Sequence, residues 1–138
     1  MSNCIFCKIV AGEIPSKKVY EDDVVVAFHD IEPQSPVHVL VVPKKHIVGV
    51  NELTREDEAI VGHAYGVISK LVKELKVDET GYRVVVNSGR DGQQSVPHLH
   101  FHILGGRLLA WPPGYSVTDF KRRSVNALLF YFALLSVV

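Results

Sequence analysis

The stretch PHLHFHIL, residues 97–104, alternates histidines with large apolar residues. A β-strand points successive side chains to opposite faces, so this alternation predicts a strand with His98, His100 and His102 on one face. The other face, formed by Leu99 and its apolar neighbours, can join a core. If the three imidazoles on the histidine face were buried only for packing, each would need a polar partner. The histidine face therefore indicates a functional site, either a histidine-x-histidine metal site or a site of phosphoryl transfer.

The loop before this strand favours phosphoryl transfer. Residues 87–95 read NSGRDGQQS and offer two glycines, the Asn87 amide and the Ser95 hydroxyl. A loop of this kind can direct successive backbone N–H groups at phosphate oxygens. By itself the same composition is equally typical of an ordinary hairpin loop. Followed by three histidines on one strand face, it predicts a phosphate site.

The rest of the sequence predicts an α+β fold. Apolar residues at helical spacing from Ile60 to Leu75, with Thr54 as N-cap, indicate one long helix. A short helix is expected before Gly12, and the β-rich runs around Asp22 suggest a hairpin. The expected strands are 18–21, 24–30, 37–42, 84–87 and 96–104. Because strands and helix do not alternate regularly, we expect an antiparallel sheet with the long helix on one face.

Composition limits the classes of function. The 138 residues suit one domain, and 15 basic against 15 acidic residues give no positive surplus for holding nucleic acid. Cys4 and Cys7 are too few and too close together for a disulfide-stapled secreted domain. The N-terminus has no charged start followed by an apolar run, as a signal peptide would. A cytoplasmic protein is therefore expected.

The C-terminal part of the chain differs from the rest. We expect a catalytic domain over residues 1–114, ended by WPPG at 111–114, and an extension over residues 115–138. After KRR at 121–123, residues 125–138 are almost wholly apolar, but this run is shorter than the roughly 20 residues that span a bilayer. A tail packed on the domain or on a partner, or a non-native C-terminus, is expected rather than membrane attachment.

Further motifs between residues 4 and 114 resemble the histidine-triad nucleotide-binding family, and within it the Hint branch of phosphoramidases. They are CIFCKI at 4–9, AFHDI at 27–31, PVHVLVVPKKH at 36–46, QSV at 94–96, LGGR at 104–107 and WPPG at 111–114. The resemblance implies a HIT-like fold and a homodimer. It also implies hydrolysis of purine nucleoside 5′-phosphoramidates, such as adenylyl-amines, or of related adenylates, through a nucleotidyl-histidine.

The resemblance also implies the roles of individual residues. His100 matches the nucleophile that attacks the α-phosphorus, and His102 matches the residue that contacts the phosphate and assists the leaving group. His38 matches a fourth histidine of that network, and Asp30 matches the carboxylate that binds the ribose hydroxyls. The matches to phosphate-loop positions are Asn87, Gln93 and Ser95. The matches to the apolar base pocket are Ile5, Phe6, Ile9, Ile14, Phe28 and Ile31, with His29 at the edge.

Cys4 and Cys7 have the spacing of half a tetrahedral zinc site, although two reduced thiols would have the same sequence. In zinc-bearing bacterial members of the family two histidines complete the site, and His46 and His98 stand at the matching positions. The resemblance therefore implies a structural zinc ion. His98 would then be a metal ligand and take no part in proton transfer.

The sequence departs from the family pattern at Gln93, which replaces a glycine of the loop, at Pro97, which replaces an aromatic residue, and in the extension. Three other functions stay open. One is hydrolysis of dinucleoside polyphosphates, as in the Fhit-like branch, although LGGR and WPPG argue against it. The others are a nucleotide-binding interaction module with little turnover and a catalytic zinc enzyme.

Overall fold

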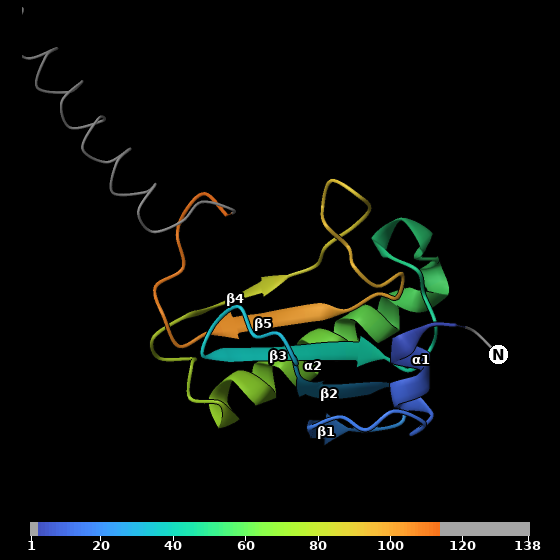
Figure 1. Ribbon diagram of the computed structural model, residues 1–138, viewed down its shortest axis with the longest axis horizontal. Helices are drawn as coiled ribbons and strands as arrows, with labels where there is room; N and C mark the ends of the chain where they lie inside the picture. The colour runs from blue at the N-terminus through green and yellow to red at the C-terminus, as the bar shows by residue number, and fades with distance from the viewer. Residues whose placement is uncertain (1–2, 114–138) are drawn as a thin grey trace, which may run out of the picture. The chain divides into compact units, whose positions relative to one another are not determined.

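The computed structural model describes residues 3–113, and its main feature is a five-stranded antiparallel sheet (Figure 1). The spatial order is β1-β2-β3-β5-β4. The strands are β1 (Lys18–Glu21), β2 (Val25–His29), β3 (Val37–Pro43), β4 (Tyr82–Val85) and β5 (Phe101–Gly105). The helices are α1 (Ile5–Val10) and α2 (Glu58–Glu74), with short 3₁₀ turns η1 (Val50–Glu52) and η2 (Arg55–Asp57). The predicted α+β class, the antiparallel sheet and the single long helix are confirmed.

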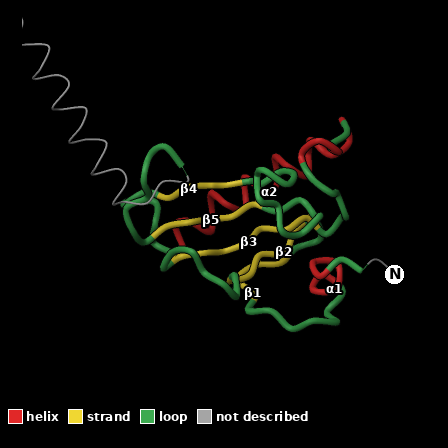
Figure 2. Tube along the Cα trace, turned by 45° about the horizontal axis from the view of Figure 1, so that its top comes forward, coloured by secondary structure: helices red, strands yellow, loops and turns green. Residues whose placement is uncertain are grey.

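The two faces of the sheet bury different sets of side chains. On one face, α2 packs against the strands and forms the larger core with Leu99, Phe101 and Ile103. On the other face, α1 covers only one end of the sheet, where Phe6 and Phe28 belong to a smaller core (Figures 1 and 2). Leu99, Phe101 and Ile103 therefore point away from the face that carries the histidines, as their alternation predicts.

The strand that carries the histidines is shorter than predicted. It begins at Phe101, where pairing with Val41 of β3 starts, so only His102 of the three histidines lies in a strand. The preceding backbone makes other hydrogen bonds. The His98 N–H donates to the Val96 carbonyl oxygen at 2.8 Å, and the Leu99 N–H donates to the Ile47 carbonyl oxygen at 2.6 Å. Residues 96–100 thus lie beside the segment after β3 and do not pair with a strand.

The helix and β4 also start away from their predicted bounds. Thr54 precedes η2, and α2 begins only at Glu58. Thr54 is the N-cap of η2 and forms a capping box with Asp57, whose carboxylate accepts the Thr54 N–H at 3.0 Å and the Thr54 hydroxyl at 2.8 Å. The Lys45 ammonium, 2.6 Å away, and these bonds lower the pKa of Asp57 to about 2. β4 begins at Tyr82, two residues before the predicted position, and ends at Val85.

The chain divides into two units, Met1–Arg107 and Leu108–Val138, and every helix and strand named above lies in the first. The predicted extension at 115–138 lies outside the described residues, and the predicted domain boundary at 114 stays a prediction. Over residues 3–113, no helix combines the length and the apolar character that crossing a bilayer requires.

Candidate active site

A cavity of about 610 Å³ lies on the face of the sheet opposite α2. This volume is within the range of small-molecule sites, roughly 300–1,000 Å³. One part of its lining is apolar and the other part is polar. All the residues matched to the base pocket line it, namely Ile5, Phe6, Ile9, Ile14, Phe28, His29 and Ile31. The polar residues predicted for the site that line the same cavity are Asp30, Ser95, His100 and His102.

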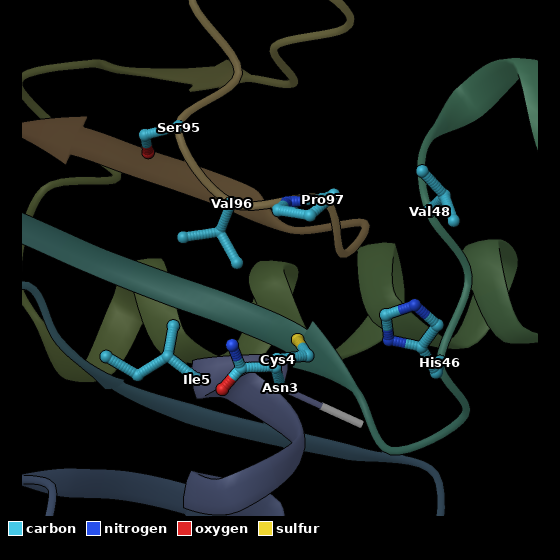
Figure 3. Close-up of a pocket in the computed structure, with 8 residues that line it drawn as sticks. All are labelled: Asn3, Cys4, Ile5, His46, Val48, Ser95, Val96 and Pro97. Carbon is cyan, nitrogen blue, oxygen red and sulfur yellow. The ribbon is translucent and has the colours of Figure 1, made fainter. Parts of the chain in front are cut away.

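A second, more open cavity of about 590 Å³ adjoins the first (Figure 3). The two share Ile5, Ser95 and Val96 in their linings. Beyond these residues the second cavity reaches Cys4 and His46. The space next to Ser95 therefore extends from the first cavity towards Cys4 and His46.

His100 is held in one tautomer by its own neighbourhood. Its side chain is buried, and its ring contacts the Phe6 ring edge-on with 5.1 Å between centroids. The ring Nδ1 lies 2.6 Å from the carbonyl oxygen of His98, so it must carry the hydrogen and donate. In the neutral ring Nε2 then keeps its lone pair. His100 is one of the residues that line the cavity.

His102 and His38 form a second imidazole pair beside it. In the sheet register His102 faces Leu40, and His38 lies two residues before Leu40, so both histidines share one sheet face. His38 Nε2 is 2.9 Å from His102 Nδ1 and 3.4 Å from a carboxylate oxygen of Asp30.

Burial keeps both of these rings neutral. Burial, together with repulsion from a charged His100 or His38, lowers the pKa of His102 to about 4. Burial also lowers the pKa of His38, although the Asp30 carboxylate acts in the opposite direction. At neutral pH the pair is therefore uncharged, and each ring has one N–H donor and one acceptor.

The phosphate-loop matches are only partly brought together. Ser95 lines both cavities, whereas Asn87 and Gln93 are in neither lining. Gln93 is exposed and adopts a φ of +55°, a left-handed conformation that glycine adopts without strain. This geometry accounts for the glycine that the family pattern has at this position. Gly92 has its own constraint, because a Cβ there would lie 2.4 Å from the Ser88 carbonyl oxygen.

Sequence reasoning missed Gln94, whose amide holds this loop in place. Its Nε2 donates to the carbonyl oxygens of Val48 at 2.6 Å and Val96 at 3.0 Å. Its Oε1 accepts the Gly89 N–H at 3.1 Å. Three bonds to backbone groups from one side chain thus connect the two ends of the loop to the segment after β3. In the sequence, Gln94 stands out only as part of the QSV motif, which does not indicate what its amide binds.

The four predicted metal ligands come together at one end of the sheet. The ligand atoms of Cys4, Cys7, His46 and His98 all lie within 4.8 Å of one another. The sulfur–nitrogen distances are 3.4 Å (Cys4–His98), 3.2 Å (Cys7–His46) and 3.6 Å (Cys7–His98), and the two Nδ1 atoms are 3.2 Å apart. Zinc–ligand bonds of about 2.3 Å to sulfur and about 2.05 Å to nitrogen give tetrahedral edges of about 3.6 and about 3.3 Å. The donor set therefore fits a tetrahedral zinc ion.

The buried ring of His98 is oriented for this role. Its Nε2 donates to the Pro43 carbonyl oxygen at 2.9 Å, so Nδ1 presents its lone pair to the thiols and to His46. Burial lowers the pKa of His98, which favours the neutral ring that a metal needs.

Asp30, His38 and His102 form a second group with potential ligand atoms within 4.8 Å of one another. Their geometry favours hydrogen bonding instead. The 2.9 Å between the two imidazole nitrogens is a hydrogen-bond length, shorter than the about 3.3 Å that separates two nitrogens bound to one zinc ion.

Comparison of the sequence and the structure with known proteins finds similarity to HIT proteins in each case. A sequence model of the HIT domain matches residues 11–109. An uncharacterized HIT-like protein of Synechococcus elongatus is 50% identical over 110 residues, which are 80% of this chain and 96% of that protein. A HIT family hydrolase from Legionella pneumophila is 46% identical with a TM-score of 0.80, covering 81% of this chain and 100% of its own. A histidine triad protein from Clostridium difficile is 52% identical with a TM-score of 0.77, covering 84% and 98%. The predicted HIT-like fold is confirmed.

Proposed function

The chain belongs to the HIT domain family, and we propose that it is a hydrolase that cleaves the P–N bond of purine nucleoside 5′-phosphoramidates or related adenylates. One observation carries the proposal. His100 Nδ1 donates to a backbone carbonyl oxygen, so the neutral ring has its lone pair on Nε2, and His100 lines the same cavity as the apolar pocket and Asp30. An unprotonated imidazole is the form of histidine that can attack phosphorus.

The cavity suggests how a nucleotide would bind. The purine would lie among the isoleucines and against Phe6 and Phe28, whose rings contact each other edge-on with 5.8 Å between centroids. Asp30 would accept hydrogen bonds from the ribose hydroxyls. The α-phosphate would lie between Ser95 and His100, where the Ser95 hydroxyl can donate to a phosphoryl oxygen. The leaving group would extend past Ser95 into the second cavity.

The reaction then takes two steps. His100 Nε2 forms a bond to the α-phosphorus, and the P–N bond breaks with its electron pair leaving on nitrogen. Where His102 carries its hydrogen on Nε2, a hydrogen bond from that N–H would stabilise the developing charge. Water next attacks the nucleotidyl-histidine and restores the neutral ring of His100. The leaving nitrogen takes up one proton from solvent as the P–N bond breaks, and the attacking water returns one proton to solvent in the second step, so that together the steps consume one water.

The test is to trap the intermediate. Wild-type protein mixed with an adenosine 5′-phosphoramidate and quenched in milliseconds should show, by mass spectrometry, an adenylyl group on the peptide containing His100. The His100→Ala variant should show no adduct and lose at least about a thousandfold in kcat. His63→Ala is the matched control, because His63 lies on α2 and pairs with Asp22 at 2.7 Å. Turnover in His100→Ala equal to that in wild type would refute the mechanism.

Zinc is the metal that we propose for Cys4, Cys7, His46 and His98, in a structural role. The ligand distances above support a closed four-ligand site, and such sites leave no open position for substrate. Bound zinc would join α1, the segment after β3 and the segment before β5. Our proposal therefore assigns no chemical step to the metal.

We also propose a homodimer in the cytoplasm. Two features support a second copy: β4 is an edge strand with Tyr82 exposed, and Tyr65 on α2 is half exposed. A reducing compartment would keep Cys4 and Cys7 as the thiols that the metal site needs. Light scattering on the purified protein tests the dimer directly.

A further inference from the structure

We propose that the turn at residues 32–36, held by Arg107, sets the tautomer of His38 and through it that of His102. The backbone N–H of Gln34 and the Arg107 side chain are then positioning groups for the hydrolysis. This inference rests on the proposed function for its consequence, but the tautomers themselves can be measured without it.

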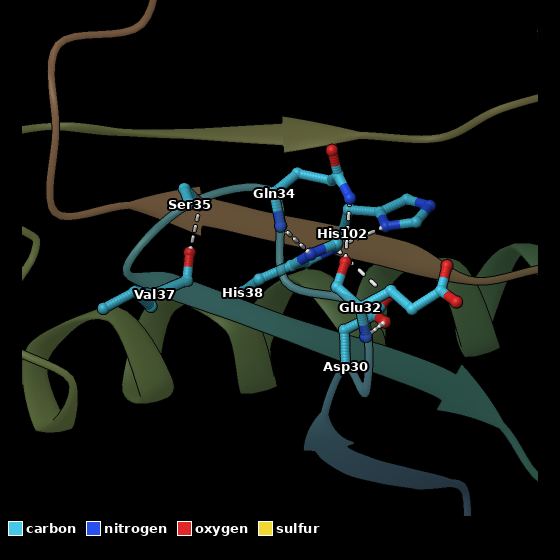
Figure 4. A network of polar contacts seen from close by, with 7 residues as sticks. All are labelled: Asp30, Glu32, Gln34, Ser35, Val37, His38 and His102. Atoms are coloured by element: carbon cyan, nitrogen blue, oxygen red, sulfur yellow. Dashed lines mark hydrogen bonds and ion pairs between the residues drawn. The ribbon is translucent and has the colours of Figure 1, made fainter.

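The first step is the contact between the turn and His38. The Gln34 backbone N–H donates to His38 Nδ1 at 3.1 Å (Figure 4). A backbone N–H can only donate, so His38 Nδ1 must be unprotonated. In the neutral ring the hydrogen therefore lies on Nε2. The same contact also disfavours a doubly protonated His38, whose Nδ1–H would face the Gln34 N–H.

The second step passes this choice to His102. His38 Nε2 is 2.9 Å from His102 Nδ1 and farther, at 3.4 Å, from the Asp30 carboxylate. With its hydrogen on Nε2, His38 donates to His102 Nδ1, which must accept. His102 then carries its hydrogen on Nε2. That atom is buried and has no hydrogen-bond partner among residues 3–113, and the residue lines the nucleotide-sized cavity.

A buried N–H without a partner at such a position calls for an acceptor from a ligand. An anionic phosphoryl oxygen or the leaving nitrogen of the substrate supplies one. The opposite arrangement of the pair is also self-consistent: His38 with its hydrogen on Nδ1 would accept from His102 Nδ1. His102 would then face the phosphate with a lone pair and repel it. The Gln34 N–H selects between these two arrangements, because only one of them accepts its hydrogen.

The turn is built to keep that N–H in place. The Glu32 N–H donates to Asp30 Oδ1 at 2.8 Å, and the Gln34 side-chain amide donates to the Glu32 carbonyl oxygen at 2.9 Å. From the segment after β5, the Arg107 guanidinium donates to the Gln34 carbonyl oxygen at 3.0 Å. Arg107 thus holds the residue whose N–H contacts His38.

The decisive experiment measures tautomers directly. Two-bond ¹H–¹⁵N correlation spectra of the folded wild-type protein, with no substrate, should show His38 and His102 both protonated on Nε2. A spectrum with the hydrogen of His102 on Nδ1 would overturn the proposal. This measurement does not depend on whether the protein hydrolyses phosphoramidates.

Two variants then test the consequence. Gln34→Pro removes the N–H, and Gln34→Ala is its control because it keeps the N–H. We expect mixed tautomers at His102 in Gln34→Pro, and kcat for a phosphoramidate lower by about tenfold to a hundredfold, the size of one lost buried hydrogen bond. For an adenylate ester of an acidic phenol, whose leaving group needs little stabilisation, the kcat of Gln34→Pro should fall less. Gln34→Ala keeps the N–H and loses only the side-chain bond to the Glu32 carbonyl oxygen, so its kcat should fall much less than that of Gln34→Pro.

Arg107→Met provides a milder perturbation in case Gln34→Pro does not fold. It should give partial mixing of the His102 tautomers and a smaller loss of kcat on the same substrate. Unchanged spectra in Arg107→Met would remove Arg107 from the proposal. Normal His102 spectra with no turnover on any adenylate would contradict the proposed function and leave the tautomer assignment standing.

Discussion

His98 and His100 are two residues apart and equally buried, yet the structure prepares them for different chemistry. Each ring donates one hydrogen to a backbone carbonyl. His98 uses Nε2, to Pro43, and so turns its Nδ1 lone pair towards two thiols. His100 uses Nδ1, to His98, and so keeps Nε2 as the unprotonated nitrogen. Under the proposed function, the choice of which ring nitrogen donates to the backbone therefore distinguishes the proposed metal ligand, His98, from the proposed nucleophile, His100.

The two sites should consequently fail separately, and removing the metal ligands should have the largest effect on folding. Cys7→Ala should lower the zinc content from about one per chain to none. The free energy of unfolding should fall by about 3 kcal/mol when free zinc exceeds its dissociation constant a hundredfold. His100→Ala should keep its zinc while it loses turnover. Metal analysis and urea denaturation of both variants measure this.

The opposite pattern would break the comparison. If His100→Ala lost zinc as completely as Cys7→Ala, the two histidines would belong to one site. Dialysis of the wild-type protein against a chelator is the control for the substitution. It should reproduce the loss of stability of Cys7→Ala, and added zinc should restore stability in the wild type alone.

Much of this fold follows from patterns that depend only on side-chain type. The alternation in residues 97–104 correctly placed Leu99 and Ile103 in the core with α2. The same pattern predicted too long a strand. The Leu99 N–H donates to the Ile47 carbonyl oxygen in a loop, and no local sequence pattern indicates this contact. The residues proposed to bind the base were identified from the family resemblance, because isoleucines that line a cavity cannot be told from core residues in a sequence.

The finer chemistry of the site could not be predicted, because it depends on backbone partners. The Gln94 side chain binds backbone carbonyl oxygens, and Gln34 acts through its main-chain N–H. Such backbone groups occur in nearly every residue, so the sequence does not show which of them are used. The hydrogen positions on His38 and His102 follow from those contacts. A sequence shows which residues can titrate, and only the fold shows which nitrogen of each ring is occupied.

The next effect, of intermediate size, concerns acid stability and His102. Its pKa is about 4 in the fold against 6.5 unperturbed, so the unfolded chain binds the proton first as pH falls. Stability from this group is full above pH 6.5 and is lost as pH falls towards about 4. Because the ring is only partly buried, we expect a loss of about 1–2 kcal/mol. Urea denaturation at pH 7 and at pH 4.5 measures it.

His102→Gln is the matched variant, since glutamine keeps a hydrogen-bonding side chain but does not titrate. Zinc release also destabilises the protein in acid, and it contributes equally to both proteins. The wild type should therefore lose about 1–2 kcal/mol more than His102→Gln between the two pH values. Equal losses of stability in the two proteins would show that burial does not hold His102 neutral.

The smallest effect concerns the loop that precedes both histidines. Gln93 has a φ of +55°, whereas Gly89 in the same loop has a φ of +70°. A left-handed conformation costs a non-glycine residue about 1–2 kcal/mol, and glycine offsets part of the gain through its freedom in the unfolded chain. Gln93→Gly should therefore raise the free energy of unfolding by up to about 1 kcal/mol. Gly89→Ala should lower it by a similar amount, although a Cβ there meets no atom within 4 Å. If Gln93→Gly instead destabilised the protein, the glutamine side chain would be supplying a contact that outweighs its backbone strain.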